Sequence, residues 1–126
     1  MTPGPISAVV VADRAAWIRR MLAGIRSLPA HSAEDFAASP QSVAAAESYL
    51  RRALEALLDL GRHILAKGFA RGVAEYKAIA AALAEEGVLR PDEAELLVRL
   101  ADYRNRMVHF YHAITDEELR LRHCPP

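Results

Sequence analysis

The sequence is short of cysteine, and this shortage excludes two kinds of structure. Cys124 is the only cysteine among the 126 residues. No disulfide can therefore form within the chain, and no cysteine-rich zinc site can be built. A single thiol fits a reducing compartment.

Net charge and long apolar runs are also absent. The formal net charge is +0, so no overall field attracts nucleic acid, and any RNA contact must come from a local patch. The apolar run over residues 6–12 is too short to cross a membrane. No basic segment precedes it, as a secretory signal would require. We therefore expect a cytoplasmic protein.

Lysine is scarce as well. Only Lys67 and Lys77 are lysines, and the other fourteen of the 16 basic residues are arginines. The planar guanidinium suits phosphate binding. An arginine-rich, alanine-rich chain can equally reflect genome composition, so this bias by itself identifies no ligand.

What the chain does contain favours helices. It is 52% hydrophobic and 25% charged, as soluble globular domains are, but only 6% aromatic. Alanine and leucine must therefore fill the core, and both favour helices over strands. We expect a single domain over residues 1–126, with residues 1–7 as a disordered arm and residues 123–126 as a flexible tail.

Apolar residues at three- and four-residue spacing predict the helices. The first three are expected over residues 8–27, 41–66 and 73–86. A fourth long helix should begin at residue 91, where acidic residues follow a proline. A capping box predicts a short last helix over residues 116–122. The fold class is all-α: an antiparallel up-and-down bundle of four to five helices.

Single residues predict where these helices begin and end. Ser39 followed by Pro40 is typical of a helix start. Gly68 is expected to end the second helix, and Gly87 to end the third in a left-handed conformation. The loop before Ser39 should place Phe36 in the core.

The fourth helix carries an apolar stripe that includes a charged residue. The predicted stripe comprises Leu96, Leu97, Leu100, Ala101, Arg104, Val108 and Tyr111. A guanidinium on a buried stripe is costly unless it is paired or lines a cleft. Arg104 is therefore the first candidate for a functional residue.

Other polar residues gather close to Arg104 in the sequence. Asn105 follows it directly, and His109, Tyr111 and His112 come within the next eight positions. Because a helix turns about 100° per residue, Arg104 and Tyr111 share a face, while His109 lies roughly 140° from Arg104. Arg104 and His109 can converge where the helix end loosens, or across a symmetric dimer interface that builds one shared cleft.

This set of residues suits RNA cleavage without a metal. A histidine titrates near neutrality, so His109 can take the proton of a ribose 2′-OH or return one to the leaving oxygen. Arg104 can hold the phosphate and stabilise its growing charge. The products would be a 2′,3′-cyclic phosphate and a 5′-OH. His109 and His112 could form a metal pair, but no third ligand is near, so we expect no metal and no cofactor.

The pattern Arg104-x4-His109-x-Tyr111 resembles the signature of HEPN domains, and in particular that of the HepT toxins of HepT–MNT toxin–antitoxin systems. The likeness extends to residues 53–64 and 76–89, and in all it covers roughly residues 36–119. The resemblance implies a small all-helical ribonuclease toxin of a type II toxin–antitoxin system. It also implies a symmetric dimer whose cleft lies at the interface.

The resemblance assigns roles to individual residues. Arg104 and His109 would be the catalytic pair, and Asn105 a polar helper. Tyr111 would be a site residue to which the antitoxin, a minimal nucleotidyltransferase, transfers AMP. Two carboxylates on the second long helix, Glu55 and Asp59, either orient Arg104 or belong to ordinary surface pairs with neighbouring arginines.

A second interpretation stays open. The chain could be a non-catalytic HEPN dimer that binds the nucleotidyltransferase and accepts nucleotide on Tyr111. Its neutral charge favours this alternative, whereas the intact Arg-x4-His pattern favours the ribonuclease. The sequence after the motif is also shorter than is common in the family, which could alter dimerisation or antitoxin docking.

Overall fold

The computed structural model describes residues 5–29 and 32–109. These residues form helices and no strands, which confirms the predicted all-α class. The five helices are α1 (Ala8–Arg26), α2 (Ala33–Ala37), α3 (Pro40–Phe69), α4 (Tyr76–Glu85) and α5 (Pro91–His109). The expected helix over residues 116–122 and the tail over 123–126 lie outside the described residues, as do residues 1–4 of the expected arm.

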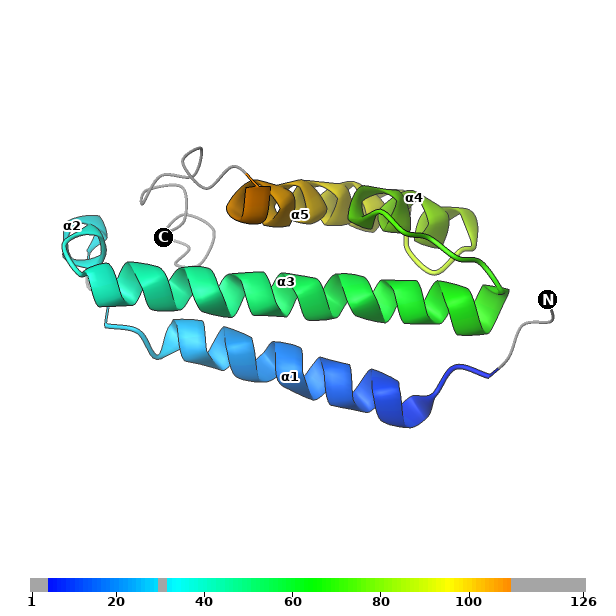
Figure 1. Ribbon diagram of the computed structural model, residues 1–126, viewed down its shortest axis with the longest axis horizontal. Helices are drawn as coiled ribbons and strands as arrows, with labels where there is room; N and C mark the ends of the chain where they lie inside the picture. Colours follow the sequence, from blue (N-terminus) through cyan, green and yellow to red (C-terminus); the bar gives the residue numbers. More distant parts are fainter. Residues whose placement is uncertain (1–4, 30–31, 110–126) are drawn as a thin grey trace.

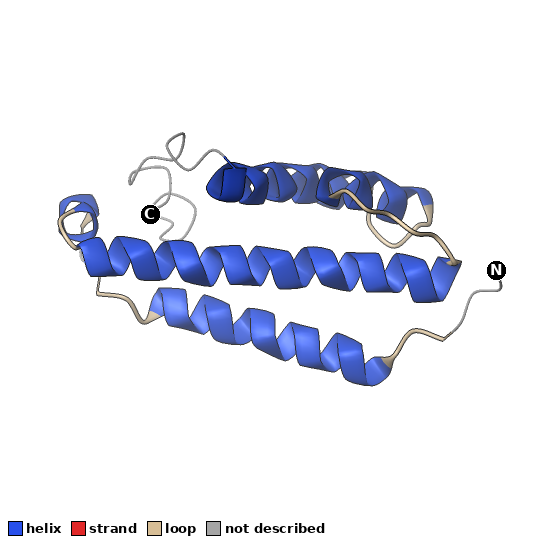
Figure 2. Ribbon diagram, in the orientation of Figure 1, coloured by secondary structure: helices blue, strands red, loops and turns tan. Residues whose placement is uncertain are grey.

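The longest helix, α3, runs through the middle of the molecule (Figure 1). α1 packs along one side of it, and α4 and α5 lie together on the other side. α1 and α5 run opposite to α3, which gives the antiparallel arrangement, and short α2 lies at one end (Figure 2). In the described ranges, no helix combines the length and the apolar character needed to cross a membrane.

Serine side chains begin the first three helices. The hydroxyl oxygens of Ser7, Ser32 and Ser39 accept hydrogen bonds from backbone amides in the first turns of α1, α2 and α3. Such caps satisfy amides that have no partner within the helix. The start predicted at Ser39 and Pro40 is therefore confirmed.

Two predicted boundaries were wrong. The expected loop between the first two long helices contains α2, whose Phe36 is 1% exposed and lies in the core as predicted. Gly68 does not end the second long helix, because α3 continues to Phe69. The C-cap residue that follows, Ala70, has a left-handed φ of 50°. A Cβ at position 68 would lie 2.8 Å from the tip of the Ile6 side chain, which would have to shift.

The start of the third long helix was predicted three residues too early. It was expected from residue 73, but α4 starts at Tyr76. The carbonyl oxygens of Val73 and Ala74 accept hydrogen bonds from Arg62 of α3, at 3.0 and 2.7 Å. Arg62 thereby fixes these residues in a loop. At the other end of α4, Gly87 has a φ of 76°, as the predicted left-handed C-cap requires.

The core consists of two apolar clusters along α3. The first cluster includes Phe36, Leu50, Leu54, Tyr103 and Met107. The second cluster includes Leu58, Leu65, Ile79, Leu97 and Ala101. Helices α3 and α5 each contribute to both clusters, so the boundary between the clusters crosses both helices.

The apolar stripe predicted on α5 was partly wrong. Leu97 and Ala101 are buried as expected, but Leu96 is 54% and Val108 42% exposed. Tyr103 and Met107, which the prediction left out, are buried instead. The buried positions 94, 97, 101, 103 and 107 follow the face that α3 and α4 cover, and the apolar sequence pattern extends beyond that face.

Candidate active site

Arg104 lies on α5 with only 17% of its side chain exposed. Its guanidinium carbon is 4.6 Å from the centre of the Tyr76 ring, which is a cation–π geometry. Nη1 donates a hydrogen bond to the side-chain oxygen of Asn105 at 3.3 Å. Nη2 lies 3.6 Å from a carboxylate oxygen of Glu55. The charge on the stripe is therefore paired, as the cost of burial demands.

One donor of this guanidinium is left unused. Nε of Arg104 is buried and has no hydrogen-bond partner among the described residues. Buried polar groups are nearly always satisfied, and exceptions cost free energy. The surroundings thus hold Arg104 in place although they do not satisfy it completely, which is more typical of a functional group than of a structural ion pair.

Arg104 and Asn105 line a cleft of about 600 Å³, which we call the Arg104 cleft. Its remaining lining residues come from α3, the α3–α4 loop, α4 and α5: Arg62, Ala74, Glu75, Tyr76, Lys77 and Asp102. The ammonium group of Lys77 pairs with Asp102 at 3.2 Å, which links α4 to α5. The cleft is therefore polar, and both basic and acidic side chains line it.

The two carboxylates proposed to orient Arg104 have different partners. Glu55 forms an ion pair with Arg104 and also accepts a hydrogen bond from Arg51 at 3.1 Å, which is an ordinary pair within α3. Asp59 accepts hydrogen bonds from Arg62 and from the Tyr76 hydroxyl, each at 3.3 Å. Asp59 therefore reaches Arg104 only through the Tyr76 ring.

Two residues of this site were missed from the sequence. Tyr76 lies beneath Arg104, and the guanidinium carbon of Arg62 is 4.9 Å from the same ring. Burial of the ring, with the Asp59 charge beside it, raises the pKa of Tyr76 above its ordinary value, although Arg104 and Arg62 oppose the rise. Tyr76 therefore stays protonated and acts as a neutral donor and stacking surface.

The structure brings Arg104, Asn105 and Glu55 together, with Asp59 one contact further away. His109 is the last residue of α5 and follows Arg104 by five positions on the same helix. Tyr111 lies outside the described residues, as does His112. In the described ranges, no three His, Cys, Asp or Glu side chains gather closely enough to hold a metal ion.

Comparison with known families shows the family of this chain. The model of the HepT-like ribonuclease family matches residues 18–120, which includes α5 and the whole Arg104 cleft. The chain belongs to the HepT-like family. The resemblance inferred from the Arg-x4-His pattern is thereby confirmed.

Other comparisons concern this HepT-like fold alone. A solved structure described as cytosolic protein YutE of unknown function, from Bacillus subtilis, is similar with a TM-score of 0.75. The two chains are 23% identical, and the match covers 94% of this chain and 80% of YutE. No curated protein matches this chain with statistical significance.

Proposed function

We propose that this HepT-like protein is an endoribonuclease toxin that cleaves RNA without a metal ion. Membership of a family of HepT-like ribonucleases supports the reaction class. The observation that carries the proposal is the setting of Arg104. It is a largely buried guanidinium held by Glu55, Asn105 and Tyr76 at the wall of a polar cleft, on the helix that ends in His109.

The proposed reaction is an internal transesterification. His109 accepts the proton of the ribose 2′-OH, and the 2′ oxygen attacks the adjacent phosphorus. The bond between phosphorus and the 5′ oxygen breaks, and that oxygen takes a proton from a histidinium. Arg104 stabilises the charge that develops on the phosphate oxygens. The products are a 2′,3′-cyclic phosphate and a 5′-OH.

We further propose that two copies assemble around this cleft. His109 follows Arg104 by five positions, which places the two residues roughly 140° apart on a helix. Two-fold pairing of α5 would let the arginine of one copy approach the histidine of the other. Exposed Val108, immediately before His109, is an apolar residue that such an interface would cover.

The proposal includes the regulation of the toxin. A minimal nucleotidyltransferase would act as antitoxin and transfer AMP from ATP to the Tyr111 hydroxyl, releasing pyrophosphate. The added phosphate would place negative charge two residues from His109 and block RNA binding by repulsion.

The test compares wild-type protein, expressed alone, with the His109→Ala and Arg104→Ala variants on total cellular RNA. We expect cleavage in the presence of EDTA, with cyclic phosphate ends, and loss of at least about a hundredfold in each variant. DNA should be inert, since it lacks the 2′-OH. If unmodified, folded wild type leaves RNA intact, the ribonuclease proposal fails. A mass gain of one AMP group that Tyr111→Phe abolishes would then favour the non-catalytic alternative.

A further inference from the structure

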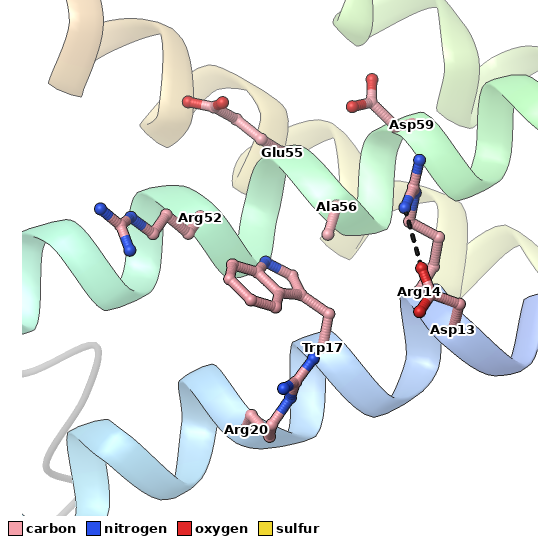
Figure 3. Close-up of a pocket in the computed structure, with 8 residues that line it drawn as sticks. All are labelled: Asp13, Arg14, Trp17, Arg20, Arg52, Glu55, Ala56 and Asp59. Atoms are coloured by element: carbon pink, nitrogen blue, oxygen red, sulfur yellow. Dashed lines mark hydrogen bonds and ion pairs between the residues drawn. The ribbon is translucent and has the colours of Figure 1, made fainter. Parts of the chain in front are cut away.

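A second polar cavity lies between α1 and α3. It has a volume of about 280 Å³, and we call it the Trp17 groove. Figure 3 shows the residues that line it, from α1 and from α3: Asp13, Arg14, Trp17, Arg20, Arg52, Glu55, Ala56 and Asp59. The volume is near the lower end of the roughly 300–1,000 Å³ of small-ligand pockets. It can take a nucleobase or a phosphate, but not a folded partner.

The acidic residues of the groove already have partners. Asp13 pairs with Arg14 at 3.2 Å (Figure 3). Glu55 and Asp59 pair with arginines outside the groove and, for Asp59, with the Tyr76 hydroxyl. Each carboxylate is thus neutralised by a cation close to it.

Two arginines of the groove have no acidic partner. Among the described residues, no carboxylate forms an ion pair with Arg20 or Arg52. Both side chains belong to exposed residues. Because the other charged residues of the groove are in ion pairs, Arg20 and Arg52 leave it with two positive charges that can bind an anion.

An aromatic surface lies between these charges. The half-buried indole of Trp17 is flanked by Arg20 of α1 and by Arg52 of α3 (Figure 3). The guanidinium carbon of Arg20 is 5.0 Å from the centre of the Trp17 rings. An aromatic plane between unpaired arginines is how proteins bind single-stranded nucleic acid: bases stack on the ring, and phosphates contact the guanidinium groups.

The groove adjoins the Arg104 cleft through two of its lining residues, because Glu55 contacts Arg104 and Asp59 contacts Arg62 and Tyr76. Glu55 lines the Trp17 groove, and its carboxylate lies 3.6 Å from Arg104, which lines the other cleft. A strand bound at Arg104 can therefore extend past Glu55 into the groove.

We propose that the Trp17 groove is a second contact site for single-stranded RNA. A base stacks on Trp17, and the flanking phosphates contact Arg20 and Arg52. This inference rests on the proposed ribonuclease function, because it assigns the groove to the same substrate. It adds a preference: the enzyme selects unpaired RNA next to the cleavage point, since a paired base cannot reach the ring.

The chain offers an internal reporter, because Trp17 is its only tryptophan. The His109→Ala variant, which we expect not to cleave RNA, is titrated with a short single-stranded oligoadenylate. Tryptophan emission is recorded during the titration. Binding of the same oligonucleotide carrying a dye is measured separately by anisotropy. We expect saturable quenching of emission at the oligonucleotide concentrations that give the anisotropy change, and little quenching by duplex RNA.

Charge reversal tests the two arginines. In the same background, Arg20→Glu/Arg52→Glu should weaken binding at least about tenfold and lower the salt slope of the binding constant by about 1.4, as expected for two single-strand phosphate contacts. The matched control is Arg19→Glu/Arg26→Glu. It changes the net charge equally, on exposed arginines of α1 outside the groove. The control pair should leave the slope within about 0.5 of the parent.

Two results would overturn the inference. One is anisotropy binding with no change in Trp17 emission, and the other is equal weakening by the groove pair and the control pair. Circular dichroism confirms folding, and Arg20→Gln/Arg52→Gln replaces the glutamates if they unfold the protein. Failure of the ribonuclease proposal looks different: wild type would not cleave, while quenching and its dependence on Arg20 and Arg52 would persist.

Discussion

Glu55 is the carboxylate that reaches Arg104 directly, and its contribution can be measured. Glu55→Gln removes the charge but keeps the shape, so Arg104 loses one constraint on its position. A partly exposed pair of this kind is worth up to about 1 kcal/mol. We expect kcat for RNA cleavage to fall about fivefold, with KM and the unfolding midpoint nearly unchanged.

A matched exchange controls for charge alone. Glu95 pairs with Arg99 at 3.0 Å on an exposed face of α5, and Glu95→Gln should leave kcat unchanged. Glu55→Asp should recover part of the loss. Equal kcat values for Glu55→Gln and Glu95→Gln would show that Arg104 needs no carboxylate to hold it.

Tyr76 predicts a dependence of stability on pH. Burial, the largest cause, raises the pKa of Tyr76 above 10.0 in the folded protein. The folded chain therefore keeps this proton longer than the unfolded chain. The associated stability is fully present below pH 10.0 and is lost as the pH rises through the folded pKa.

Urea unfolding of Tyr76→Phe tests this. At about pH 8 the variant should be less stable by about 1 kcal/mol, because Asp59 loses a hydrogen bond. Above about pH 10 the gap should narrow, since the variant has no proton to lose at this position. The other tyrosines are present in both proteins, so their contributions to the pH dependence cancel in the difference. A gap that stays constant with pH would contradict the assignment.

At the scale of residues, local sequence predicted part of the site. Arg104 and Asn105 are neighbours in the chain, so their candidacy could be inferred from the pattern on α5, whereas Glu55 was a hypothesis with surface pairing as its alternative. Tyr76 and Arg62 could not, because 28 positions separate Tyr76 from Arg104 and only tertiary packing puts the ring beneath the guanidinium. The roles of His109 and Tyr111 remain predictions.

The end of α3 offers a prediction at the scale of elements. Ala70 has a φ of 50°, a left-handed conformation that is costly for a residue with a Cβ. The backbone amide of the next residue, Arg71, bonds the carbonyl of Leu65 at 2.9 Å and fixes this geometry. Ala70→Gly should relieve the strain and raise the free energy of unfolding by about 0.5–1 kcal/mol, after the entropy cost of glycine.

Ala66→Gly is the matched control in urea unfolding. It makes the same exchange at an exposed position inside α3, where φ is helical, and should lower stability by about 1 kcal/mol. The two exchanges should change the free energy of unfolding in opposite directions. This difference separates the effect of the left-handed backbone at Ala70 from the general effect of replacing alanine with glycine. Lower stability for both variants would show that Ala70 is not strained.

Elements with a local signal were predicted well, and those fixed by distant contacts were not. The Ser39–Pro40 start and the Gly87 cap follow from the backbone chemistry of those residues. Gly68 was predicted to end the helix, but the residue with a left-handed φ is Ala70, two positions later. Likewise α4 starts late because Arg62, eleven residues before Val73, holds the loop carbonyls.

At the scale of the whole molecule, the proposed dimer makes a prediction. Val108 is 42% exposed, so Val108→Glu should fold, yet it would place a charge in an interface at the end of α5. We expect wild type to have twice the chain mass of 13.8 kDa by light scattering, and the variant to be monomeric and inactive.

Val9→Glu is the control, since Val9 is 79% exposed on α1, across α3 from α5. It should remain dimeric and active. A wild type that cleaves RNA as a monomer would rule out a cleft shared by two copies.

The boundary between the two apolar clusters has a consequence for how such proteins can evolve. Glu55 lies between Leu54 of one cluster and Leu58 of the other, and Arg104 follows Tyr103 of the first cluster and Ala101 of the second. The polar pair thus sits at the boundary between the two clusters and belongs to neither. For the proposed ribonuclease, we expect that substitutions of this pair leave both apolar clusters in place, so a lineage could lose or redirect the chemistry while the scaffold on either side persists.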